Sequence, residues 1–147
     1  MLNDNTVYKL HEMRLGVMAQ AFREQMKDSG FNDMSFEERL GLLVDAEWAT
    51  RKNNRLVRLI KNADYALNAA CVEDIEYHPD RKLDKAQLTR LAACNYIQEY
   101  HNVVILGATG SGKTYLSNAL GIAANRNFYT VNYVRLPDLL GELAIAR

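Results

Sequence analysis

The apolar positions in the first sixty residues recur at helical spacing. Between residues 7 and 26 they return every three or four positions, and Ser29-Gly30 ends the pattern. A second helix is predicted to begin at Ser35, which can form a capping box with Glu38. Its apolar stripe passes through Trp48, which we expect to be a buried anchor of the core. The short link between the two helices favours a helical hairpin.

The pattern changes near residue 101. Residues 102–106, Asn-Val-Val-Ile-Leu, are a short apolar run rich in β-branched side chains, which predicts a buried parallel strand. A loop follows in residues 107–112 and a helix in residues 113–126. Residues 127–135 alternate as a second strand would, and residues 138–146 have the pattern of a final helix. Residues 102–147 therefore predict a βαβα unit of an α/β domain.

The predicted organisation has three parts. Residues 1–70 form a helical N-terminal region, and residues 71–101 form a linker and a helix that lead into the core. Residues 102–147 form the first unit of the α/β domain, which is incomplete because two strands are too few to bury both faces of a sheet. We therefore expect the chain to stop inside this domain.

Composition places the chain among ordinary globular proteins. Its 147 residues carry 18 basic and 18 acidic side chains, and 48% are hydrophobic, which excludes a disordered tail. Cys71 and Cys94 fit neither a disulfide framework nor a zinc site, and we expect both to be buried as small hydrophobes. The three histidines show no metal-binding spacing. The sequence has no long apolar run and no signal peptide, so we expect a cytoplasmic protein without a membrane partner.

The chemistry concentrates in the loop after the first predicted strand. This loop fits the phosphate-binding pattern G-x-x-x-x-G-K-[ST], in which glycines leave the backbone N–H groups open to a polyphosphate. The first amides of the next helix face the same anion. Lys113 would meet the β- and γ-phosphates, and Thr114 would bind Mg²⁺. We predict ATP and magnesium as ligands of Gly107, Ala108, Thr109, Gly110, Ser111, Gly112, Lys113 and Thr114.

Residues for ATP hydrolysis are not identified. Hydrolysis needs an acid at the end of another strand, a residue that positions water and usually an arginine finger. Only Asp138 and Glu142 are acidic after Lys113, and neither ends a predicted strand. The Walker B, sensor and arginine-finger regions are therefore absent from this sequence, and the catalytic residues stay unassigned. Tyr96 and Tyr100 could border an adenine pocket, but packing is the favoured interpretation.

Several stretches of the chain resemble one family. They are SFEERL at residues 35–40, DAEW at 45–48, CVEDI at 71–75 and the phosphate-binding loop, or P-loop. Together they resemble the IstB-like helper ATPases of bacterial insertion sequences, which are relatives of the DnaC helicase loaders in the AAA+ class. Ala108 stands where the family often has proline, and Tyr115 where it often has histidine. The implied fold is an α/β P-loop NTPase of AAA+ type, C-terminally truncated and preceded by an all-α helical N-terminal region.

The resemblance implies an ATP-binding helper of DNA transposition. Such proteins bind ATP, assemble on DNA and direct a transposase to its target, and we expect the full-length protein to be a homo-oligomer. The N-terminal region contains a basic helical stripe that would contact DNA phosphates without reading sequence, although such a stripe can also be a plain solvated face. Its members are Arg51, Lys52, Arg55, Arg58 and Lys61.

Two other functions stay open from the sequence. A replicative helicase loader of the same ATPase class would bind a hexameric helicase instead of a transposase. A non-catalytic, truncated remnant of such an ATPase would bind partners without turning over ATP. A pull-down distinguishes the helicase loader from the transposition helper. A phosphate-release assay distinguishes a non-catalytic remnant from an active ATPase.

Overall fold

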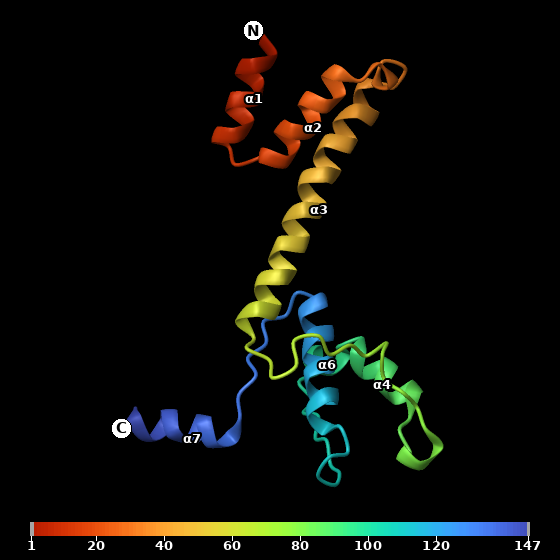
Figure 1. Cartoon of the computed structure of the whole chain (residues 1–147), viewed down its shortest axis with the longest axis vertical. Coiled ribbons are helices and arrows are strands. Elements are labelled where there is room, and N and C mark those ends of the chain that lie inside the picture. Colours follow the sequence, from red (N-terminus) through yellow and green to blue (C-terminus); the bar gives the residue numbers. More distant parts are fainter. Residues whose placement is uncertain (1, 147) are drawn as a thin grey trace. The chain divides into compact units, whose positions relative to one another are not determined.

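The computed structural model of the chain describes residues 2–146 and is drawn in Figure 1. Its α-helices are α1 (Leu2–Glu12), α2 (Gly16–Lys27), α3 (Phe36–Asn62), α4 (Lys85–Ala92), α5 (Asn95–Gln98), α6 (Lys113–Arg126) and α7 (Leu136–Ile145), and its 3₁₀ turns are η1 (Ser29–Phe31) and η2 (Pro79–Arg81). The chain divides into two compact units, residues 1–55 and 56–147. This division falls inside α3, whereas the sequence placed its first boundary at residue 70.

The N-terminal unit differs from the expected single first helix. The helical pattern of residues 7–26 is split between α1 and α2 by a turn at Arg14, whose φ of 59° lies in the left-handed region. This turn folds the two helices together, so Val7 and Leu10 of α1 pack on Ala19 of α2. One continuous helix would hold these side chains apart, and burying them together favours the break.

The start of α3 confirms the predicted capping box. The Ser35 amide donates to a Glu38 carboxylate oxygen at 2.8 Å, and the Glu38 amide donates to the Ser35 hydroxyl at 3.2 Å. The predicted helical hairpin is formed by α2 and α3. The Met18 amide of α2 donates to the Glu47 carboxylate of α3 at 3.0 Å. These bonds fix both the start of α3 and the face that it turns toward α2.

Trp48 is not the buried anchor that the stripe suggested. It is 63% exposed, whereas Leu43 and Glu47 on the neighbouring side of α3 are buried. The hydrogen bond from α2 goes to Glu47, so the side of α3 that carries Glu47 is the covered one. The ammonium of Lys52 lies 5.5 Å from the centre of the Trp48 ring, which is within cation–π range.

The core of the C-terminal unit is built on α6. Ala119 and Ile122 of this helix pack with Ala70, and Tyr115 is half-buried against the same cluster. The helix begins and ends where the sequence predicted, at residues 113 and 126. Its buried side faces the chain segment that precedes α4, and this arrangement brings residues near position 75 close to the P-loop.

The two predicted strands are not present among residues 2–146. Residues 102–106 are irregular, and Val104 and Leu106 are 77% and 88% exposed instead of buried. Residues 127–135 begin with a turn and stay irregular. A strand needs a neighbour that accepts and donates its backbone hydrogen bonds. No described segment supplies such a neighbour, so the predicted α/β sheet is replaced here by helices and irregular chain.

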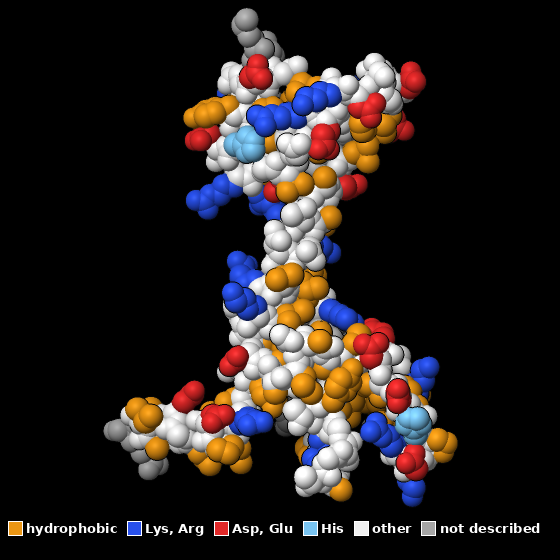
Figure 2. Space-filling model, in the orientation of Figure 1, with side chains coloured by type: hydrophobic (Ala, Val, Ile, Leu, Met, Phe, Trp, Pro, Cys, Tyr) orange, Lys and Arg blue, Asp and Glu red, His pale blue; other side chains and the backbone are white. Residues whose placement is uncertain are grey.

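The last helix, α7, begins two residues earlier than predicted and carries Pro137 in its first turn. It exposes apolar side chains, including Leu140 at 57% and Ile145 at 88%. Figure 2 shows hydrophobic side chains on the surface of this helix. No helix in the described part of the chain is long and apolar enough to cross a membrane.

Candidate nucleotide-binding site

The P-loop has the backbone that its glycines permit. Gly110 and Gly112 have φ values of +77° and +90°, in the left-handed region where side chains with a Cβ atom are strained. Gly112 is the N-cap residue of α6, and no side chain caps this end of the helix. The first amides of α6 are therefore left for a ligand, and the helix dipole favours an anion at this end.

Gly107 lies close to the end of the same loop. A Cβ atom at this position would lie 2.8 Å from the Ser111 hydroxyl oxygen, so a larger residue would force the Ser111 side chain to move. The Ser111 amide donates to the Ala108 carbonyl at 3.3 Å across the same turn. The three glycines thus serve a narrow turn that keeps the backbone of residues 107–112 at the surface.

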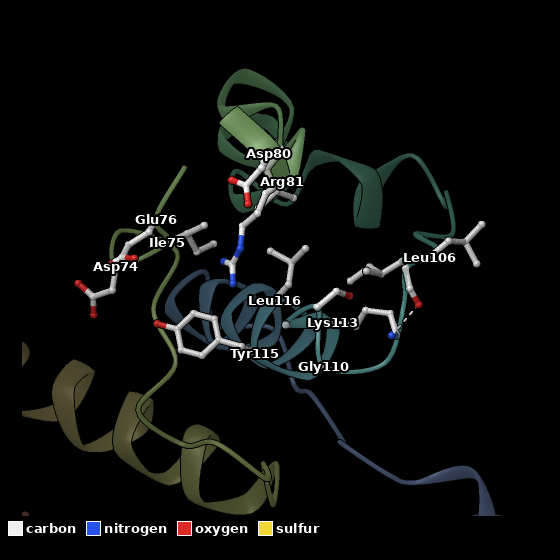
Figure 3. A pocket seen from close by; sticks show the side chains of 15 residues that line it. Asp74, Ile75, Glu76, Asp80, Arg81, Leu106, Gly110, Lys113, Tyr115 and Leu116 are labelled. Atoms are coloured by element: carbon white, nitrogen blue, oxygen red, sulfur yellow. Dashed lines mark hydrogen bonds between the residues drawn. The ribbon is translucent and has the colours of Figure 1, made fainter. Parts of the chain in front are cut away.

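Lys113 folds back over the loop that precedes it. Its ammonium donates to the carbonyl oxygens of Gly107 at 2.7 Å and Ala108 at 2.6 Å, and the bond to Gly107 is drawn in Figure 3. Carbonyl oxygens are partial negative charges, so this position already suits a positive group next to the loop. Thr114 is exposed directly after Lys113, where its hydroxyl is open to a ligand.

A cavity of about 720 Å³ opens beside the loop, a size within the range of small-molecule sites. One wall is the P-loop and the first turn of α6. The other wall is a segment that sequence analysis did not assign to the site, residues 74–83, which we call the strap. The lining residues are Asp74, Ile75, Glu76, Asp80, Arg81, Leu83, Ile105, Leu106, Gly107, Gly110, Ser111, Gly112, Lys113, Tyr115 and Leu116.

The chain just before the strap is fixed by Tyr115 of α6. The Tyr115 hydroxyl donates to the Cys71 carbonyl and accepts from the Cys71 amide, each at 3.2 Å. Tyr115 stands at a position where the resembled family often has histidine. The contact joins positions 44 residues apart, so no local sequence pattern could have indicated it.

A polar cluster next to Cys71 adds a second anchor. The Arg126 guanidinium donates to both carboxylate oxygens of Glu73 at 3.0 Å, and the Cys71 thiol donates to the same carboxylate. The thiol hydrogen bond and the guanidinium hold the pKa of Glu73 down, at about 2. Cys71 is thus half-buried and hydrogen-bonded, not a plain hydrophobe, whereas Cys94 is buried as expected.

The strap ends at α4, which contacts α6. Asp84 caps α4, because its carboxylate accepts from the amides of Ala86 at 2.8 Å and Gln87 at 3.3 Å. Neither Tyr96 nor Tyr100 lines the cavity, so neither tyrosine borders this pocket. Tyr96 is half-buried, but Tyr100 is 94% exposed, which contradicts packing at that position.

The basic residues that the sequence assigned to DNA all lie on α3 and are exposed. Figure 2 shows Lys and Arg side chains along this helix. Arg51 has structural contacts as well, since it donates to Glu47 at 2.8 Å and to the Arg14 carbonyl at 2.7 Å. The Arg51 bond is the main cause that lowers the pKa of Glu47. Arg51, Lys52 and Arg55 belong to the N-terminal unit, and Arg58 and Lys61 to the second unit.

The sequence was compared with known families and curated proteins. The profile of the family described as IstB-like ATP binding protein matches residues 8–147. An ATP-binding protein of insertion sequence IS1162 from Pseudomonas fluorescens is 42% identical over 146 residues, which is 99% of this chain and 63% of the relative. Two insertion sequence ATP-binding proteins of Sinorhizobium fredii are each 37% identical over all 147 residues, which cover 60% and 59% of their lengths.

The chain thus spans about three fifths of the length of these curated relatives. The match extends over the helical N-terminal unit as well as the P-loop, so it does not rest on a common phosphate-binding motif alone. The chain belongs to the family of IstB-like ATP binding proteins.

Proposed function

We propose that the chain binds ATP at the P-loop as part of an insertion sequence's transposition machinery. The observation that carries this proposal is Lys113, placed over a glycine loop at the uncapped start of α6 and beside a cavity of nucleotide size. The names of the relatives support ATP as the ligand and an insertion sequence as the setting. Titration of the chain with ATP by calorimetry tests it, and the absence of saturable binding would refute it.

Magnesium would accompany ATP. The Thr114 hydroxyl is an oxygen donor of the kind that Mg²⁺ prefers, and it is exposed at the end of the loop where the phosphates would lie. When bound, the ion would neutralise phosphate charge. We expect Thr114→Ala to weaken ATP binding in the presence of Mg²⁺ and to leave binding in EDTA nearly unchanged. An equal loss in both buffers would argue against a magnesium role for Thr114.

The α/β architecture belongs to the proposal as well. Val104 and Leu106 are apolar residues at exposed positions, and an apolar β-branched run of this kind is typical of a buried strand. We infer that residues 102–106 and 127–135 become strands where further strands of the ATPase domain are present. The three predicted parts, residues 1–70, 71–101 and 102–147, would then be a helical region, a connection and the start of that domain.

DNA is the partner that α3 would bind. Arg55 and Arg58 are exposed on this helix, and Lys61 follows near its end, so the three can meet a phosphate backbone without reading bases. We expect affinity for duplex DNA to fall steeply as salt rises. Fluorescence anisotropy measures this, and affinity that is independent of salt would refute the assignment.

A matched pair of variants separates this stripe from general charge. Arg55→Gln/Arg58→Gln/Lys61→Gln should weaken DNA binding strongly. Lys9→Gln/Arg23→Gln/Lys27→Gln removes the same charge from α1 and α2 and should weaken it little. Arg51 and Lys52 are left intact in the test because Arg51 bonds to Glu47 and Lys52 stacks on Trp48. Equal losses in both triple variants would indicate non-specific charge attraction only.

We also propose that the full-length protein assembles into a homo-oligomer and directs a transposase. The relatives named for insertion sequences favour a transposase over a replicative helicase as the partner. A pull-down with each protein in the presence of ATP distinguishes the two. A phosphate-release assay decides whether the chain turns over ATP, because the catalytic residues stay unassigned.

A further inference from the structure

The strap is an anchored segment, not a free loop. At one end Tyr115 holds Cys71 and Arg126 holds Glu73, and at the other end Asp84 caps α4, which contacts α6. Between these anchors the chain turns sharply at Lys82, whose φ of 51° lies in the left-handed region. The turn η2 just before it is therefore held over the cavity in a defined place.

Arg81 is the residue that η2 presents to the cavity. Its side chain points from the turn toward the start of α6, where Tyr115 and Leu116 line the same space (Figure 3). No hydrogen bond or ion pair joins its guanidinium to another residue of the part described, although Asp80 is its neighbour in sequence. Its charge therefore has no partner among the described residues, and an anion in the cavity would supply one.

The expected ligand carries more negative charge than Lys113 alone can neutralise, so a second cation in the cavity would favour binding. A triphosphate carries three or four negative charges, and among the described lining residues only Lys113 and Arg81 are cationic. Lys113 lies at the loop, where the β- and γ-phosphates would be. Arg81 lies beside Leu116, one helical turn further along α6. A nucleotide with its terminal phosphates at the loop would extend past this point toward its ribose and base.

We propose that Arg81 binds the α-phosphate of the nucleotide, from the same chain that supplies the P-loop. This inference rests on the proposed ATP binding and adds the strap to the site. The apolar lining residues Ile75, Leu83 and Leu116 leave the base a non-polar surface beside the exposed guanidinium. The planar fork of arginine suits two phosphate oxygens at once, which a lysine cannot match.

The test compares adenosine, AMP, ADP and ATP on the complete chain, by direct titration or by competition against a fluorescent ATP analogue. We expect Arg81→Gln to weaken the binding of AMP, ADP and ATP by a similar factor of about ten. The affinity for adenosine should change by less than about twofold. Arg81→Lys should fall between Arg81→Gln and the parent protein. Lys82→Gln is the matched control, because it removes one charge from the adjacent residue, which does not line the cavity.

Salt dependence gives a second readout. A phosphate contact is screened by salt, so ADP binding by Arg81→Gln should depend less steeply on salt than binding by the parent protein. An equal loss for adenosine, or an unchanged salt slope, would mean that Arg81 stacks on the base and would overturn the proposal. A loss confined to ATP would overturn it too, because the contact would then be with the γ-phosphate.

The outcomes also separate this inference from the proposed function. If the parent protein binds ATP and Lys113→Ala weakens that binding strongly while Arg81→Gln matches the parent, only the role of Arg81 is refuted. If the parent protein binds none of the four ligands, ATP binding itself is refuted and the role of Arg81 falls with it. Circular dichroism melts of each variant check that Arg81→Gln folds as the parent does, as expected for an exposed side chain that bonds to no other described residue.

Discussion

The ammonium of Lys113 lies 2.7 Å from the carbonyl oxygen of Gly107, the first residue of its own loop. A second carbonyl, that of Ala108, is 2.6 Å away. The lysine is therefore already directed at the loop and would exchange two carbonyl oxygens for phosphate oxygens when a nucleotide binds. Because phosphate carries full charge and the carbonyls only partial charge, this exchange favours the bound state.

Lys113→Ala should consequently weaken ATP binding by about 2–3 kcal/mol, a factor of roughly 30 to 150 in Kd. The unliganded protein should melt at nearly the same temperature as the parent, since the lysine bonds are at the surface. Lys85→Ala, on α4 and outside the cavity lining, is the control for loss of one charge. A Kd for Lys113→Ala equal to that of the control would remove the P-loop from the proposed site.

The sequence predicted the features that depend on near neighbours. The Ser35–Glu38 capping box and the start of α6 after Gly112 are both set within a few residues. Local backbone preferences and caps decide such elements, so they can be inferred from a short stretch of chain. The P-loop belongs to this class, which explains why it was found without a structure.

The features that the sequence missed depend on distant contacts. The strap reaches the cavity because Tyr115 bonds to Cys71, 44 residues earlier in the chain. Trp48 is exposed because α2 covers the side of α3 that carries Glu47. The apolar run at Val104 predicts a strand, but strands also require neighbours, and no described segment provides them. Periodicity indicates which apolar residues share a face of a helix or strand, but it does not indicate which segment covers that face.

Tyr115→Phe tests the first anchor of the strap. The variant keeps the ring in its half-buried cluster and loses both hydrogen bonds to the Cys71 backbone. We expect the free energy of unfolding to fall by about 1–2 kcal/mol in a urea titration. Tyr100→Phe is the control, since it removes a hydroxyl from a side chain that is 94% exposed. It should change the free energy of unfolding by less than about 0.5 kcal/mol. Equal effects of the two variants would contradict the anchoring role.

Two glycine variants should have opposite effects on stability. Gly112 has a φ of +90°, so Gly112→Ala strains the backbone at the start of α6 and should destabilise the fold by about 1 kcal/mol. Gly41 lies inside α3, and an added Cβ meets nothing within 4 Å, so Gly41→Ala should stabilise it by about 0.5–1 kcal/mol. Urea titrations measure both. Destabilisation by Gly41→Ala would mean that this face of α3 is covered.

The Glu73 cluster predicts an acid-dependent loss of stability. The pKa of Glu73 is about 2 in the folded chain, below the ordinary value of 4.5, chiefly because the Cys71 thiol donates to its carboxylate. A backbone hydrogen bond at Glu73 and the Arg126 guanidinium lower the pKa further. A carboxylate whose pKa is depressed by folding stabilises the folded state above its unfolded pKa. That contribution is complete above about pH 4.5 and is lost as the pH falls toward 2.

Glu73→Gln should therefore be less stable than the parent at neutral pH, and the difference should shrink as the pH falls from about 4.5 to 2. Thermal melts across this range measure it, with Glu142→Gln on α7 as the control for loss of one carboxylate. Carbon-13 NMR of the Glu73 carboxyl gives its midpoint directly. Cys71→Ala and Arg126→Gln should each raise that midpoint, because each removes a group that lowers the pKa of Glu73. A midpoint near 4.5 in the parent protein would show that the cluster does not form in solution.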